Sequence, residues 1–372
     1  MSMLGTEFIQ RLDQYFPPAL AESDDPVGLH IGTLNKQISK VMMTLDVRPE
    51  VVAEAVREEV DLIVAKHPPI FRPIKRLTVD DPQNKMYSEL IKHDIAVYAI
   101  HTNMDIVEDG LNDWFCELLK IGETDFLKVT HEVPYLKLSV TVPTDHAESV
   151  RGALEKAGAG QQGDYGGCSF SMAGEGRFTP VGNAEPYLGS LNQGEVVAET
   201  KIEVMLLETQ RHQIVKAMLA AHPYEEPAYD LIYLANPPKQ FGIGRVGDLE
   251  EALTLVEFVQ QVKEVFQLEG LRLISDNPDK LVKRVAICGG SGEKFFRDAV
   301  KANADVYITG DVYYHTAHDM IAEGISVIDP GHHIEVLCQE RCLTLFEQWK
   351  QENNWNITFI ESKEDTNPFR YY

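Results

Sequence analysis

The sequence predicts a mixed α/β protein in which two βαβ-type halves form a layered domain that is interrupted by a smaller α+β module. Two regions support this fold class, because each alternates short apolar runs with segments of helical periodicity. The stretch between them differs, with alternating apolar and polar positions and many glycines. We therefore expect a main domain of residues 1–130 and 241–372, and an inserted domain of residues 131–240.

The first region contains three expected strands separated by helices. Its strands are Val41–Val47, Leu62–Ala65 and Ile95–Ile100, and its helices are Pro49–Val60, Asn84–His93 and Leu111–Lys120. Pro49 stands in a first helical turn, where proline is tolerated because that turn needs no amide donor. Strands separated by helices favour parallel pairing through βαβ units.

The last third repeats this pattern. Its expected strands are Val282–Cys288, Val306–Thr309, Ile325–Ile328 and Ile357–Ile360, and its helices are Glu293–Ala302, Tyr313–Ala322 and Ile334–Trp349. Because the same pattern appears on both sides of a different stretch, we expect the two regions to form one domain.

The inserted stretch has the order of a small ferredoxin-like module. Its expected strands and helices are Tyr135–Val142, Ala147–Ala157, Val196–Leu207, Gln210–Ala221 and Ala228–Leu234, with a glycine-rich excursion at Gly158–Gly182. Pro237, Pro238 and the glycines of GIGRVG (Gly242–Gly247) are expected to end the module, since both residue types interrupt regular structure.

Composition excludes several function classes. The 372 residues carry a net charge of −24, which disfavours nucleic acid as a partner, and 44% are hydrophobic, which excludes wholesale disorder. None of the five cysteines forms a CxxC pair, as expected of reduced thiols. The N-terminus lacks signal-peptide features, and no apolar run approaches the roughly 20 residues of a membrane span. We expect a cytoplasmic protein without membrane or nucleic-acid partners.

Five side chains of the types that bind metals follow expected strands. His67 follows one strand directly, His101 follows the next with Asp105 four residues later, and His332 follows a strand of the last third. Glu335 lies three residues after His332, about one helical turn along. Ligands of open α/β sheets bind outside the carboxyl ends of the strands, so these segments are expected to converge.

Imidazole and carboxylate together suit zinc, iron, manganese or nickel, and two metals bridged by a carboxylate would use all five side chains economically. Such a pair activates water and supplies positive charge that the acidic chain otherwise lacks. The alternative for each residue taken alone is a helix cap or a turn.

Four weaker patterns have either a functional or a structural role. They are CGGSG (Cys288–Gly292), the pair Asp311 and His315, the basic residues Lys66, Lys75 and Arg76, and HPYEEP (His222–Pro227). The glycines favour a plain turn because they lack the spacing of a phosphate-binding loop. Asp311 or His315 would orient a ligand or begin a helix. The basic residues would meet a substrate phosphate or form a solvated surface, and HPYEEP would serve an interface or form a solvated loop.

Several motifs together resemble the family of GTP cyclohydrolase I type 2 homologues, also called Nif-three-like proteins. They are DDPVGLHIG, LDVRPEVVAEA, KHPPIF, HTNMDIVEDGLND, CGGSG, ADVYITGDVYYH and DPGHHIE, while GEGRFTPVG and AHPYEEPAYD resemble the CutA-like module of the longer branch. The resemblance implies a homohexamer with two divalent ions per chain, zinc foremost and iron or manganese as alternatives. His67, Asp105, His332 and Glu335 match the family's metal ligands, and His101 matches a further ligand or neighbour.

Lys66 departs from the family, which usually has a second histidine at this position. A neutral lysine can bind a metal ion, but a protonated one repels cations, so its ammonium would fill one metal's place or the second metal would bind weakly. The leading hypothesis is a metal-dependent hydrolase acting on a nucleotide or a similar anionic small molecule. The competing hypothesis is a non-enzymatic protein that binds metal or ligand and uses the insert for assembly.

Overall fold

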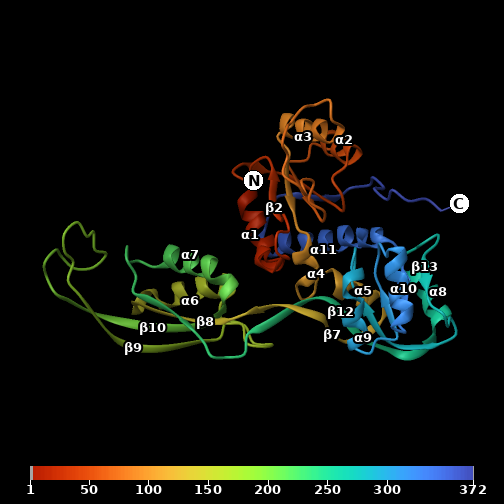
Figure 1. Ribbon diagram of the computed structural model, residues 1–372. Helices are drawn as coiled ribbons and strands as arrows, with labels where there is room; N and C mark the ends of the chain where they lie inside the picture. Colours follow the sequence, from red (N-terminus) through yellow and green to blue (C-terminus); the bar gives the residue numbers. More distant parts are fainter. Residues whose placement is uncertain (1–2, 372) are drawn as a thin grey trace. The chain divides into compact units, whose positions relative to one another are not determined.

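The computed structural model describes residues 3–371 and divides into two compact units (Figure 1). The main unit comprises Met1–His131 and Phe241–Tyr372, and the insert unit comprises Glu132–Gln240. The expected mixed α/β fold class is confirmed, because helices cover the sheets of both units.

The main unit contains a five-stranded sheet built largely from the first region of the sequence. Its order is β17 (Thr358–Glu361), β4 (Lys40–Thr44), β5 (Leu62–Ala65), β6 (Ala96–Ala99) and β2 (Gly28–Ile31). The first four strands pair in parallel and β2 is antiparallel. β5 and β6 are fully buried, as expected of central parallel strands that have helices on both faces.

Helices from both ends of the chain cover this sheet. They are α1 (Gly5–Tyr15), α2 (Pro49–Arg57), α3 (Pro82–Lys92) and α11 (Leu337–Asn353). α2 and α3 share a core with the strands. On α1, the Phe8 ring lies 5.2 Å from Phe346 of α11 and 5.4 Å from Phe359 of β17. The C-terminal segment is therefore part of the N-terminal sheet's packing.

A second, six-stranded sheet completes the main unit. Its order is β13 (Arg272–Ile274), β16 (Ser326–Asp329), β15 (Val306–Ile308), β14 (Leu281–Ile287), β12 (Lys239–Thr254) and β7 (Ile121–Val133). β14, β15 and β16 are parallel, and β12 and β13 join them antiparallel. The accompanying helices are α4 (Thr102–Ile106), α5 (Leu111–Leu119), α8 (Leu255–Val265), α9 (Phe296–Lys301) and α10 (Tyr314–Ala322).

A buried arginine connects the second sheet to α5. Arg245 of β12 binds both carboxylate oxygens of Asp113 at 2.6 Å. The same guanidinium donates to the carbonyl oxygens of Val107, Gly242 and Gly244. A buried guanidinium whose donors are satisfied in this way fixes β12 against the helix that precedes β7.

The insert unit is a four-stranded antiparallel sheet with two helices on one face. The chain order is β8 (Tyr135–Pro143), α6 (Ala147–Lys156), β9 (Ser169–Phe178), β10 (Glu195–Leu207), α7 (Arg211–Ala221) and β11 (Tyr229–Tyr233). In space the strands lie in the order β11, β8, β10, β9. Apolar side chains of α6 and α7 pack on β8 and β10, so this unit has its own core.

The described residues of the main unit also form a short two-stranded sheet of β1 (Met3–Leu4) and β3 (Gln37–Ile38). Two sequence expectations need correction. The glycine-rich excursion contains strand β9. The GIGRVG motif lies within β12 and does not end the insert, because its glycines permit close strand approach: a Cβ on Gly247 would lie 2.5 Å from the Gly122 carbonyl oxygen. Over residues 3–371, none of the helices has the length and apolar character that crossing a bilayer requires.

Candidate metal centre

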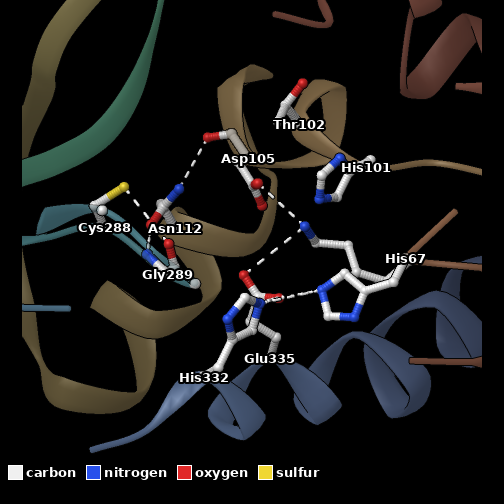
Figure 2. Close-up of polar contacts among 12 residues, drawn as sticks. His67, His101, Thr102, Asp105, Asn112, Cys288, Gly289, His332 and Glu335 are labelled. Atoms are coloured by element: carbon white, nitrogen blue, oxygen red, sulfur yellow. Dashed lines mark hydrogen bonds and ion pairs between the residues drawn. The ribbon is translucent and has the colours of Figure 1, made fainter. Parts of the chain in front are cut away.

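All five of the expected site residues gather within the main unit, as Figure 2 shows. His67 and His101 come two residues after β5 and β6 of the five-stranded sheet, respectively. Asp105 lies in α4, and Glu335 with His332 lies in the 3-10 turn His332–Val336 after β16. Each segment leaves the carboxyl end of a parallel strand, where ligands of such sheets bind.

Three of these side chains converge on one point. The Glu335 Oε2 atom lies 2.9 Å from His67 Nε2 and 3.3 Å from His332 Nε2. The two Nε2 atoms lie 3.3 Å apart, and one ligand atom from each of the three residues falls within 4.8 Å of the others. Two imidazoles and one carboxylate at this spacing form a donor set that a single divalent ion can bind.

A carboxylate lies behind each histidine ring. Asp46 Oδ1 is 2.8 Å from His67 Nδ1, and Asp311 Oδ2 is 2.7 Å from His332 Nδ1. Because an ionised carboxylate only accepts hydrogen bonds, each Nδ1–H donates to the carboxylate behind its ring, and a metal ion that replaced the Nε2 hydrogen would meet the Nε2 lone pair. This orientation by a carboxylate is typical of metal-binding histidines.

His101 shares this arrangement beside the three converging residues. Its Nδ1 atom is 2.7 Å from Asp25 Oδ1, and its ring centroid is 5.7 Å from that of His67. Asp25 also accepts hydrogen bonds from the Thr102 backbone and side chain, which fixes the start of α4. His101 is thus held at the rim of the same cluster, outside the group of three.

Lys66 occupies the centre of the cluster. Its side chain is 1% exposed, and its Nζ atom lies 3.1 Å from Asp105 Oδ2 and 3.8 Å from Glu335 Oε1. Burial alone would lower the pKa of Lys66, but the two carboxylates outweigh burial and raise it, so the ammonium stays charged. The structure therefore places a cation of the chain itself between the two buried carboxylates.

Asp105 keeps one unsatisfied oxygen. Its Oδ1 atom is buried without a hydrogen-bond partner among the described residues. Burial raises the pKa of this carboxyl despite the neighbouring Lys66, whereas the pKa of Glu335 lies well below its ordinary value because Lys66 and both histidines outweigh its burial. An orphaned oxygen beside an imidazole–carboxylate cluster is the feature expected where a further cation or donor belongs.

The protonated histidines supply the positive charge that a metal ion would otherwise provide at this cluster. Burial would lower the pKa of His332, but hydrogen bonds with Asp311 and Glu335 outweigh it and raise the pKa to about 10. The pKa of His67 is also raised, since Asp46 and Glu335 outweigh its burial. A divalent ion that binds the Nε2 atoms would displace these protons.

The CGGSG loop packs directly on this cluster. Gly290 has a φ of +61°, and a Cβ at this position would lie 2.9 Å from Glu335 Oε1 and 3.3 Å from His332 Nε2. The amide of Gly289 donates to Asn112 Oδ1, whose side-chain nitrogen donates to the Asp105 carbonyl. The loop is thus a glycine turn, as favoured from sequence, that also forms a wall of the site.

Two contributors were missed by the sequence analysis. Asp46 and Asp25 were not singled out, although Asp46 follows β4 at the same sheet edge and Asp25 lies in the DDPVG motif. Of the open pair, Asp311 contacts His332, whereas His315 is exposed on α10 and meets the Tyr314 ring edge to face. Lys75 and Arg76 are exposed, unlike Lys66.

Residues 3–368 match the model of the Duf34/NIF3 (NGG1p interacting factor 3) family. A Bacillus subtilis protein named GTP cyclohydrolase 1 type 2 homolog is 42% identical over 100% of this chain and 99% of its own length. A Listeria innocua protein of the same name is 41% identical over 99% of this chain and 98% of its own. The crystal structure of a Bacillus cereus protein related to NIF3 has a TM-score of 0.84 at 38% identity, with 100% of both chains covered. The chain therefore belongs to the Duf34/NIF3 family.

Proposed function

We propose that this chain is a divalent-metal-dependent hydrolase that acts on a nucleotide or a similar anionic small molecule. The observation that supports this most directly is the convergence of His67, His332 and Glu335, with a carboxylate behind each imidazole. The shared name of the curated relatives, GTP cyclohydrolase 1 type 2 homolog, makes GTP the first substrate to test.

The donor set fits zinc, with iron and manganese as alternatives. A bound ion would supply Lewis acidity and lower the pKa of water at the site. We propose one ion per chain, held by His67, His332 and Glu335, with the Lys66 ammonium neutralising Asp105 in place of the second ion that the family resemblance implies. Binding of two ions would instead recruit Asp105 and His101, and would require Lys66 to leave its present position.

A cleft beside the three converging residues offers room for the anion. Its volume is about 520 Å³. His67, His332 and Asp311 line this cleft, and so does Arg48. The exposed Arg48 guanidinium makes no ion pair within residues 3–371. Arg48 thus provides a local positive charge for a substrate phosphate in an otherwise acidic chain.

Turnover of GTP and a nucleotide panel by the zinc-loaded chain tests this function. Glu335→Gln is expected to abolish turnover because it removes the negative charge of the carboxylate that lies beside the Nε2 atoms of both His67 and His332. Arg48→Met is expected to raise KM about tenfold for phosphorylated substrates while kcat changes little. Arg57→Met, an exposed arginine near the end of the same helix, is the matched control and should change neither.

If the fully loaded chain turns over none of these nucleotides, the hydrolase proposal is wrong. Retained zinc binding in that case would favour the competing function, a non-enzymatic protein that binds metal or ligand.

We also propose that the chain assembles through its insert unit, which we regard as CutA-like, into the homohexamer that the family resemblance implies. The sheet face opposite α6 and α7 exposes Phe170, Met172 and Ile232. Large exposed apolar side chains on one face are typical of subunit interfaces. Sedimentation velocity should give a hexamer that Phe170→Ser weakens, and a monomer would contradict the proposal. We place the protein in the cytoplasm, where its free cysteines would stay reduced.

A further inference from the structure

The insert unit contains a cavity of about 380 Å³ that the proposed hydrolase function does not use. It lies between the end of β9, the segment 180–188 and the turn 224–228. Its volume falls within the range of about 300–1,000 Å³ that is usual for small-molecule sites. All of its lining residues belong to the insert unit.

A buried carboxylate is the main polar group of this cavity. Glu199 is 7% exposed, and its Oε1 atom accepts a hydrogen bond of 3.0 Å from the Tyr224 hydroxyl. Among residues 3–371, the Tyr224 hydroxyl is the one group that donates a hydrogen bond to this carboxylate, and its other oxygen is not sealed from solvent. A buried carboxylate with one neutral donor is costly unless a cation compensates it.

The backbone of β9 makes room for that carboxylate. A Cβ on Gly176 would lie 2.3 Å from the Glu199 Cδ atom and 2.4 Å from its Oε2 atom. The absence of a side chain at Gly176 therefore lets Glu199 lie flat against the strand and line the cavity. This close fit indicates a built position for the carboxylate, in contrast to the exposed acidic residues elsewhere on the chain.

Aromatic rings form the walls beside Glu199. The Tyr224 ring centroid lies 5.7 Å from that of Phe178 and 6.4 Å from that of Tyr187. The faces of such rings attract cations and also pack against apolar groups. Burial and Glu199 raise the pKa of Tyr224, so its hydroxyl remains a donor.

The remaining charges favour a cation over an anion. Glu175, Glu225 and Glu226 also line the cavity, and its one arginine, Arg177, is paired with Glu175 at 2.9 Å. These carboxylates are not close enough together to form a metal-type group: within residues 3–371, that grouping occurs at His67, His332 and Glu335. Separated carboxylates between aromatic rings suit an extended organic cation better than a divalent ion.

We propose that this cavity binds a small organic ammonium ion with an apolar body. The ammonium donates to Glu199, and the apolar body packs against Tyr187 and Tyr224. Burial of the pair then satisfies the carboxylate oxygen that Tyr224 leaves free. The site is independent of the metal centre, because no residue is common to both.

Calorimetric titration of the 372-residue chain with phenethylamine tests the proposal. The buffer contains about 0.15 M salt, which screens the net negative charge of the chain. We expect saturable binding of one amine per chain, and binding at least about tenfold weaker for the uncharged analogue 2-phenylethanol. Glu199→Gln keeps the shape but removes the charge, and should weaken amine binding about tenfold or more. Glu148→Gln, an exposed carboxylate on α6, is the control for net charge and should leave binding unchanged.

A second variant tests the proposal even if Glu199→Gln fails to fold. Tyr187 is 50% exposed, so Tyr187→Leu should fold normally while weakening amine binding about threefold by loss of one ring. The proposal is wrong if phenethylamine shows no saturable binding, if the alcohol binds equally well, or if Glu199→Gln binds the amine as the unmodified chain does. If a second copy of the chain occupies the cavity, phenethylamine will show no saturable binding.

Discussion

Replacement of Lys66 by methionine removes the ammonium that lies between Asp105 and Glu335. The lysine side chain is 1% exposed, and its Nζ atom is 3.1 Å from one carboxylate and 3.8 Å from the other. Methionine fills most of the same volume, so the change tests charge more than packing. The substitution leaves two neighbouring buried carboxylates without their shared cation.

The expected cost to the metal-free chain is about 3–5 kcal/mol of unfolding free energy, the usual penalty for breaking a buried ion pair by removing one partner. We expect the lower end of this range. Burial already raises the pKa of Asp105, so that carboxyl can take up a proton when the ammonium is absent. Zinc should restore about 2.7 kcal/mol at a free concentration of a hundred times its Kd, because it binds only the folded site.

Urea unfolding in EDTA, followed by tryptophan fluorescence, measures this change. All three tryptophans, Trp114, Trp349 and Trp355, lie in the main unit and therefore report on the unit that contains Lys66. The control is Lys92→Met, which breaks a surface ion pair with Glu89 from a side chain that is 61% exposed, and should leave the unfolding free energy nearly unchanged. Equal costs for the two variants would refute the interpretation of Lys66 as a buried structural cation.

Three further predictions concern the same unit. The pKa of His332 is raised from 6.5 to about 10, so the stability that its charge contributes is complete below pH 6.5 and is lost as the pH rises towards 10. Because the ring is 35% exposed, we expect this loss to be about 1–2 kcal/mol in EDTA. Urea titrations at the two ends of this pH range should show the loss in the unmodified chain but not in His332→Gln. Gly290→Ala should weaken zinc binding about tenfold in a competition titration, because its Cβ would press on Glu335 at a positive φ; unchanged affinity would contradict this close packing. Arg245→Lys should cost about 2–4 kcal/mol in thermal unfolding, since lysine cannot bind both oxygens of Asp113, and a cost below 1 kcal/mol would disprove that role.

Local patterns predicted much of the secondary structure but little of its pairing. The apolar run Leu62–Ala65 is strand β5 with the same bounds, because four consecutive buried residues are typical of a central parallel strand. The pairing of β17 with β4 was not predicted, because it joins residues more than three hundred positions apart. Sheet order depends on such contacts, which no short window of sequence contains. Strand β9 was missed because its glycines resemble a loop.

The part of the candidate site that could be predicted from the sequence consists of side chains that directly follow expected strands. His67, His101 and His332 stood out because each follows an apolar run, and the structure brings them together. Their role as metal ligands stays a prediction. The carboxylates behind the rings were less visible, since Asp46 contacts His67 only after both strands join one sheet. The burial of Lys66 was equally hidden, because an isolated lysine is normally solvated.

The measurement that tests the metal centre most directly is the zinc content of the dialysed chain, determined by elemental mass spectrometry alongside its Glu335→Gln variant. We predict one tightly bound zinc ion per unmodified chain and less than a tenth as much in the variant, because Glu335 is the carboxylate that both imidazoles share. Zinc absent from the unmodified chain after loading, or retained equally by the variant, would contradict a metal centre at His67, His332 and Glu335.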